Sequence, residues 1–372
     1  MKTQNRYFYF YYIVFYLLAI IGYSQEIQNT DTRTFQLSLV PPIGTNGSLS
    51  DQVSNKISLN LVAGHAYGVE AVEVGGFYNR VKKDVRGVQV SGFGNQVGGE
   101  VDGLQLGGFI NINKGQVDGA QVAGFLNLVS DGVKGWQLGG FTNISKATQG
   151  LQVAGFNNHS EGTKGIQLAG FTNTTRGLDG LQLAGFVNVA KEVKGVQLSI
   201  VNIADSVASG VQFGLLNISK KNGFISPAIE SDDVIPYRLT FRSGLDRFYS
   251  LLTAGMHGDD YWSYGAGFGS RVFLSHKRAL FINPELGWHH IHKDRVKPGE
   301  NSHLVKLNLN IGYALFKHLY ITGGPTLNLY ISSRLDETGK PVIDIANDPF
   351  WDEKRGRNRY QMWIGYTVGI GF

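Results

Sequence analysis

The residue types best able to do chemistry form a histidine group near the end of a predicted strand. His289, His290 and His292 lie close together, and strand alternation puts His290 and His292 on one face at a spacing compatible with a metal. The sequence fixes no carboxylate or third ligand beside them, so we interpret them as residues at the rim of a β structure. Asp259 and Asp260 could bind a cation, but we interpret them as solvated turn residues.

Other chemical motifs are weaker. Gly92, Gly94, Gly98 and Gly99 have the glycine density of a dinucleotide loop, but no helix is predicted to follow them. The serines have no nucleophile elbow. With 0 Cys the chain has no thiolate chemistry, and its net charge of +5 is too small and scattered to suggest nucleic acid. We therefore predict no catalytic residue, no metal site and no cofactor.

The strongest signal is an internal repeat in the middle of the chain. Units such as GLQVAGFNN at Gly150, GIQLAGFTN at Gly165 and GLQLAGFVN at Gly180 recur at steps of 16 and then 15 residues. A degenerate first copy has Glu73 in the Gln position, which makes about ten copies. Residues alternate in type within each unit, which indicates strands. One unit is too short to bury a face alone, whereas stacked copies could do so.

Two architectures fit these units: a β-solenoid with one coil per repeat, or a series of membrane-spanning strands. Membrane barrels alternate short and long connections, whereas these units have one uniform connection, which favours the solenoid. Stacked coils would align side-chain amides in ladders. Such ladders could bind a surface protein or a carbohydrate, or could simply hold the coils together. The candidate binding residues are Gln105, Gln121, Gln137, Gln152, Gln167, Gln182, Asn111, Asn127, Asn143, Asn158, Asn173 and Asn188.

The repeat resembles a family of bacterial surface-repeat proteins, of the spirochaete type and also found in Bacteroidota, with the pattern G-x-Q-x-G-x-x-N. The copies GVQLSIVN at Gly195 and GVQFGLLN at Gly210 lie closest to that pattern. Most other copies carry one inserted residue. The resemblance covers about residues 56–219 and implies an exposed bacterial envelope location without a defined biochemistry.

The C-terminal region predicts an antiparallel outer-membrane β-barrel. Apolar and polar residues alternate along each strand, as lipid outside and a hydrated interior require. Connections alternate between short and long, and the last strand ends in Phe372, which resembles the signal read by the barrel-assembly machinery. Eight strands are expected: 34–41, 236–243, 248–256, 262–274, 279–291, 303–315, 319–331 and 359–372. Five charged residues should point inward, where they would need to pair with one another or with water: Arg238, Arg242, Arg271, Glu285 and Lys306.

The N-terminus carries an export signal in the sequence. Lys2 and Arg6 precede an apolar run that ends with Gly22 and Ser24, so we expect cleavage after Ser24, with an uncleaved anchor as the alternative. The predicted organisation is a signal peptide (1–24), a segment with the first barrel strand (25–55), a repeat solenoid (56–219) and the barrel (220–372).

The predicted protein is therefore all-β: an eight-stranded outer-membrane barrel with an inserted solenoid. Strand parity favours display of the solenoid outside the cell, and a periplasmic solenoid is the alternative. We expect a non-enzymatic outer-membrane protein for binding, adhesion or envelope structure, in contact with outer-membrane lipid. The competing hypothesis is a lipid- or glycan-modifying enzyme with its site at the barrel rim.

Overall fold

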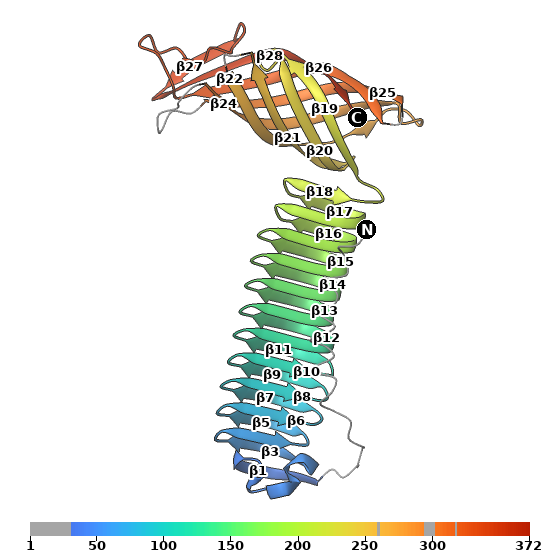
Figure 1. Ribbon diagram of the computed structural model, residues 1–372, viewed down its shortest axis with the longest axis vertical. Helices are drawn as coiled ribbons and strands as arrows, with labels where there is room; N and C mark the ends of the chain where they lie inside the picture. Colours follow the sequence, from blue (N-terminus) through green and yellow to red (C-terminus); the bar gives the residue numbers. More distant parts are fainter. Residues whose placement is uncertain (1–30, 259–260, 294–301, 317) are drawn as a thin grey trace.

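The structure is a computed structural model that describes residues 31–258, 261–293, 302–316 and 318–372. The predicted signal peptide, Asp259 and Asp260 lie outside the described residues. The described chain is all-β, with 75% of residues in strands and one short helix, η1 (Gly47–Gln52). Two β structures follow one another, a long stack of coils and then a strongly curved sheet (Figure 1). Within the described residues, no helix is long and apolar enough to cross a membrane.

The first structure is a β-solenoid of about 11 turns, built from strands β1 to β18. All strand pairings in its described residues are parallel except that of β1 with β2. Its strands are β1 (Asp31–Val40), β2 (Ile43–Gly44), β3 (Val53–Asn60), β4 (Ala63–Ala66), β5 (Val69–Gly75), β6 (Tyr78–Val81), β7 (Val85–Ser91), β8 (Gly94–Val97), β9 (Val101–Gly107), β10 (Ile110–Asn113), β11 (Val117–Ala123), β12 (Leu126–Gly139), β13 (Thr142–Ala154), β14 (Asn157–Ala169), β15 (Thr172–Ala184), β16 (Val187–Leu198), β17 (Val201–Phe213) and β18 (Leu216–Ser219).

The register of the solenoid places like residues above one another. Between β13 and β14, Asn143 pairs with Asn158, and Gln152 pairs with Gln167. The same matching continues through neighbouring turns. This parallel stacking confirms the solenoid and rules out successive membrane-spanning strands for the repeats.

Inside the solenoid the polar residues are buried and many of the apolar ones face outward. The repeated Gln and Asn side chains, such as Gln167 and Asn173, are fully buried, together with the Val, Thr or Leu that precedes each repeat, such as Leu178. Leu183 and Phe186 on the same turns are instead exposed. The solenoid thus departs from the usual arrangement of a soluble protein, in which the core is mainly apolar, because amide ladders share its interior with the aliphatic side chains.

The second structure is a sheet that closes on itself, here called the closed sheet. Its antiparallel pairings run β19-β20-β21-β22-β24-β25-β26-β28 and return to β19, within the described residues. Its strands are β19 (Phe224–Asp232), β20 (Tyr237–Leu245), β21 (Phe248–His257), β22 (Tyr261–Gly269), β23 (Val272–Phe273), β24 (Leu280–His292), β25 (Ser302–Phe316), β26 (Leu319–Ser332), β27 (Trp351–Arg355) and β28 (Asn358–Gly371).

The closed sheet has two different ends. One end, the solenoid end, holds the start of β19, the end of β28 and the connections 246–247, 270–279 and 317–318. The opposite end, the far end, holds the end of β19, the start of β28 and the connections 233–236 and 333–357. The two longest connections between strands of this ring therefore lie at opposite ends. The longer connection, 333–357, is at the far end, and the shorter, 270–279, is at the solenoid end.

The strand expected at 34–41 is not part of the closed sheet. It corresponds to β1, which pairs in parallel with β3 and belongs to the solenoid. The physical reason is that Gln36 is buried and joins the solenoid amides, accepting hydrogen bonds from Asn46 and Asn55. The closed sheet takes β19 as its eighth strand in place of 34–41. The solenoid therefore precedes the closed sheet in the chain and is not inserted between its strands.

The solenoid ends against the hairpin β20–β21. Leu245 packs among the buried residues of the last solenoid turns, including Val193 and Val207. The backbone N–H of Asn217 donates to Ser243 Oγ at 3.1 Å, and Ser250 Oγ donates to the Leu215 carbonyl at 3.0 Å. The hairpin therefore covers an end of the stack that would otherwise expose unpaired strand edges.

The glycine that opens each repeat is required by backbone geometry, which generates a stability prediction. Gly165 has a φ of +132°, and a Cβ there would lie 2.1 Å from the Gly150 carbonyl oxygen. Gly165→Ala should lower the free energy of unfolding by at least about 1–2 kcal/mol. The measurement is urea unfolding followed by circular dichroism.

Gly162 on the same turn is the matched control. A Cβ there would meet nothing within 4 Å, so Gly162→Ala should leave the solenoid unchanged or stabilise it by about 0.4–1 kcal/mol. Equal effects of the two substitutions would contradict the assigned geometry.

Candidate functional site

The amides proposed for binding form two continuous ladders in the solenoid interior. In the Gln ladder, each Gln Nε2 donates to the Gln Oε1 of the preceding turn at 2.7–3.0 Å, from Gln212 back to Gln89. In the Asn ladder, each Asn Nδ2 donates to the Asn Oδ1 of the following turn at 2.9–3.1 Å, from Asn60 to Asn217. The two ladders therefore run in opposite directions.

Burial removes these residues from contact with a ligand. Gln105, Gln121, Gln137, Gln152, Gln167 and Gln182 are 0% exposed, as are Asn111, Asn127, Asn143, Asn158, Asn173 and Asn188. The hypothesis that they form a binding surface is therefore wrong, and they act as internal supports. Sequence alternation alone could not indicate which face of these strands lies inside.

The Gln ladder ends on a carboxylate. Glu73 occupies the Gln position of its turn, is fully buried and accepts hydrogen bonds from Gln89 at 2.7 Å and from Asn60 at 3.1 Å. Donors from both ladders thus meet at one side chain that has acceptor sites to receive them. Desolvation by burial raises the pKa of Glu73 from 4.5 to about 7, although its hydrogen bonds oppose this change.

Glu73 predicts a pH dependence of solenoid stability. Between pH 4.5 and about 7 the unfolded chain releases this proton while the folded chain retains it, so rising pH favours unfolding. The contribution of Glu73 should be fully present below pH 4.5 and should fall by up to about 1.4 kcal/mol per pH unit above it. Urea unfolding of the wild-type chain at several pH values measures the slope.

Glu73→Gln is the control for this slope. We subtract the pH dependence of the free energy of unfolding of this variant from that of the wild type. The subtraction removes the contributions of His65 and His159. Burial lowers the pKa of both histidines, so they make stability rise with pH, whereas Glu73 makes it fall. A difference curve that is flat across this range would contradict the assignment to Glu73.

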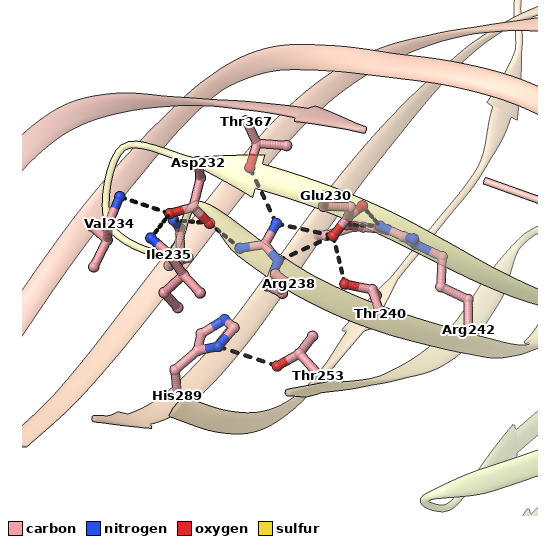
Figure 2. Close-up of polar contacts among 12 residues, drawn as sticks. Glu230, Asp232, Val234, Ile235, Arg238, Thr240, Arg242, Thr253, His289 and Thr367 are labelled. Carbon is pink, nitrogen blue, oxygen red and sulfur yellow. Dashed lines mark hydrogen bonds and ion pairs between the residues drawn. The ribbon is translucent and has the colours of Figure 1, made fainter. Parts of the chain in front are cut away.

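A second cluster, of charged side chains, fills the interior of the closed sheet (Figure 2). Glu230 on β19 lies between two arginines of β20, with Arg238 Nη2 at 2.9 Å and Arg242 Nη2 at 2.6 Å from its oxygens. Arg242 Nε lies 2.7 Å from Glu285 Oε1 on β24. These charged groups are at most 3% exposed, so each depends on its partners for stabilisation.

The cluster continues toward the far end through Asp232. This carboxylate contacts Arg238 and lies 2.8 Å from Lys306 Nζ on β25. The backbone N–H groups of Val234 and Ile235 donate to its other oxygen at 2.8 and 2.7 Å. Beyond it, a buried apolar group closes the far end of the interior, and its members are Val234, Ile235, Ile291, Leu304, Tyr330, Ile343, Ile345 and Trp363.

The inward orientation predicted for the charged residues is confirmed. Arg238, Arg242, Glu285 and Lys306 are buried and paired. Arg271 is partly buried, and its guanidinium lies over three aromatic rings, those of Phe224, Phe281 and Tyr320, at 4.5–5.0 Å from their centroids. The cluster acts as a packed interior and leaves the closed sheet without an open channel through these residues.

Sequence reasoning missed Glu230 and Asp232, which supply two of the three carboxylates described in this cluster. The available signal was the alternation of Ile225 and Ile229 with Ser226, Ala228, Glu230 and Asp232. Pro227 and the acidic run at its end interrupted that pattern.

The three histidines of the predicted group lie on two different faces of the closed sheet. His289 is buried inside the closed sheet with Nδ1 3.2 Å from Thr253 Oγ1. His290 and His292 share the outer face, where His290 Nδ1 lies 3.4 Å from His303 Nδ1. Among the described residues, no group of three or more His, Asp or Glu side chains could hold a metal ion.

The fold and these interiors define an all-β protein with a solenoid joined to a closed antiparallel sheet. Comparison of the chain with family models, with curated proteins and with solved structures finds no match.

The charged cluster generates a stability prediction. Glu230→Gln removes the carboxylate that pairs with both Arg238 and Arg242, leaving buried positive charge uncompensated. We expect a loss of about 3–5 kcal/mol in the free energy of unfolding. Urea unfolding in detergent micelles, followed by tryptophan fluorescence, measures it.

The exposed ion pair of Glu161 with Arg176, at 3.4 Å, provides the control. Glu161→Gln should cost less than about 1 kcal/mol, because water screens this pair. If Glu230→Gln cost no more than Glu161→Gln, the cluster would not be a structural support.

Proposed function

We propose that the closed sheet is a β-barrel spanning the bacterial outer membrane and that the solenoid is a rigid, non-enzymatic element of the cell envelope held by it. The observation that carries this proposal is the apolar outer surface of the closed sheet. On β25 and β28 the outward side chains are 46–71% exposed and almost all apolar: Leu307, Leu309, Ile311, Tyr313, Leu315, Ile364, Tyr366, Val368, Ile370 and Phe372.

Such a surface suits lipid and not water. Soluble monomers rarely expose a continuous apolar area of this kind, and here the charged residues occupy the interior. The outward residues from Leu307 to Leu315 span the 9–11 residues that a tilted strand needs to cross a bilayer. Trp262, Tyr264 and Trp288 lie on the outer face toward the far end, which is typical of the aromatic girdles of membrane barrels.

The two ends of the closed sheet support an orientation. Membrane barrels have short periplasmic turns and longer outer loops. The far end holds the longest connection, 333–357, whereas the solenoid end holds the two-residue connections 246–247 and 317–318. We therefore infer that the solenoid end faces the periplasm, together with the C-terminal Phe372.

This orientation replaces the expectation of surface display. That expectation depended on counting 34–41 as a strand of the closed sheet, whereas β1 pairs with β3 in the solenoid. The start of β19 and the end of β28 are paired neighbours, Ala228 with Gly371, so the solenoid and the C-terminus leave from the same end. The C-terminal strand remains our proposed contact with the barrel-assembly machinery.

A structural role follows from the buried ladders. The amides that could have formed a binding surface are enclosed, and the interior of the closed sheet is filled by ion pairs. A rigid stack attached to a membrane anchor is suited to supporting or spacing envelope components.

Cysteine labelling of cells tests the proposal, since the chain has 0 Cys. A membrane-impermeant maleimide should label Glu337→Cys, in the long far-end connection, on intact cells. It should label Lys164→Cys, on the solenoid, only after the outer membrane is permeabilised. Both positions are exposed.

Three results would contradict this proposal. Labelling of Lys164→Cys alone on intact cells would reverse the orientation, with the solenoid displayed outside. Equal labelling of both positions on intact cells, or of neither until permeabilisation, would argue against a spanning closed sheet.

A further inference from the structure

From Gly87 to Ser219 the solenoid carries charge along only one of its edges. Each turn from the one that opens at Gly87 to the one that opens at Gly210 begins with ten residues that contain no Asp, Glu, Lys or Arg. The charged residues come in the remaining part of the turn, as with Lys191, Glu192 and Lys194. We call the side formed by the first ten residues the charge-free edge.

The charge-free edge is built from exposed apolar columns. Phe77, Phe93, Phe109, Phe125, Phe141, Phe156, Phe171 and Phe186 stack at centroid distances of 4.8–5.3 Å and are 37–53% exposed. Beside them run aliphatic side chains such as Ile166 and Leu183, each 39% exposed. Trp136, which is 60% exposed, lies on the same edge. This surface runs along almost the whole solenoid.

The apolar column continues onto the closed sheet. Leu183, Leu198 and Phe213 occupy equivalent positions on successive turns. The ring of Phe213 meets that of Phe248 at 4.6 Å, and Phe248 meets the outward Phe268 at 5.4 Å. The charge-free edge is therefore continuous with the outer surface that we assign to lipid.

The direction of the solenoid agrees with this continuity. Figure 1 shows that the solenoid leaves the closed sheet sideways and does not extend it along its length. An element that leaves a membrane-spanning barrel sideways from one end runs beside the bilayer and does not project away from it.

We propose that the solenoid lies along the surface of the membrane that the closed sheet spans, with its charge-free edge in the interfacial layer of the phospholipid bilayer. This inference depends on the proposed function, because it requires the closed sheet to be in a membrane. An amphipathic element in the interface buries its apolar side about 5–10 Å into the boundary between headgroups and acyl chains. The charged edge, with cross-turn ion pairs such as Arg176 with Glu161, then faces water.

Lipid quenching of single-cysteine variants tests the inference. The full chain, carrying Phe171→Cys, Ile166→Cys, Lys164→Cys or Leu309→Cys, is labelled with a small fluorophore. It is then reconstituted into phosphatidylethanolamine–phosphatidylglycerol vesicles with brominated acyl chains. Phe171 and Ile166 lie on the charge-free edge, Lys164 lies on the charged edge of the same turn, and Leu309 points outward from the closed sheet. All four positions are exposed, so a label requires no repacking.

We expect brominated lipid to quench labels at 171, 166 and 309, and aqueous iodide to quench the label at 164. Lipid quenching at 309 without quenching at 171 or 166 would overturn the inference and leave the membrane-spanning closed sheet intact. Absence of lipid quenching at 309 would remove the proposed function and the inference together. Labels at 171 and 166 that escape both quenchers would indicate that a second copy covers this edge, which also overturns the inference.

Discussion

The solenoid depends on one interaction: the Gln and Asn side chains of the two buried ladders pair with their counterparts on the neighbouring turns. A coil of 15 or 16 residues encloses too little space for a large apolar core, so its interior combines the ladders of Gln and Asn side chains with small aliphatic ones such as Val193 and Ala204. Leaving one such amide unpaired costs about 1–3 kcal/mol, and the cost would be repeated on every turn. The uniform register, the repeat length and the opening glycine all serve this pairing.

The ladders also determine what the two ends of the stack must provide. Because the ladders run in opposite directions, their dipoles oppose one another along the stack. The Gln ladder ends on Glu73, and the Asn ladder ends on Ser250 of the closed sheet, reached by Asn217 at 3.1 Å. Once amides and ion pairs occupy both interiors, many apolar side chains are left on the outside, and this shared inversion supports the lipid environment that we propose for the solenoid and the closed sheet.

The sequence predicts much of this architecture where the pattern is periodic. The repeat step predicts the solenoid, and alternation locates β20, β21, β24, β25, β26 and β28 closely, including the inward Arg242 and Glu285. The strand expected at 262–274 is divided into β22 and β23, and β27 was not expected. Periodicity cannot say which face of a repeat is inside, because an apolar interior is the usual solution and an amide interior obeys the same period. Periodicity also fails to identify β19, because Pro227 and the acidic residues interrupt its pattern. It cannot show that β1 joins the solenoid, because that depends on hydrogen bonds of Gln36 with Asn60 and Asn55, which are distant in the sequence.

The stacking of like residues has a consequence for how this chain can change over generations. Each turn contacts only the turn before and the turn after it, so stability accumulates turn by turn. Gene duplication or deletion of one whole unit in the middle would join identical surfaces and leave both end structures in place. The length of the solenoid can therefore change in steps of one turn by duplication or loss of a whole repeat, without requiring a new kind of contact.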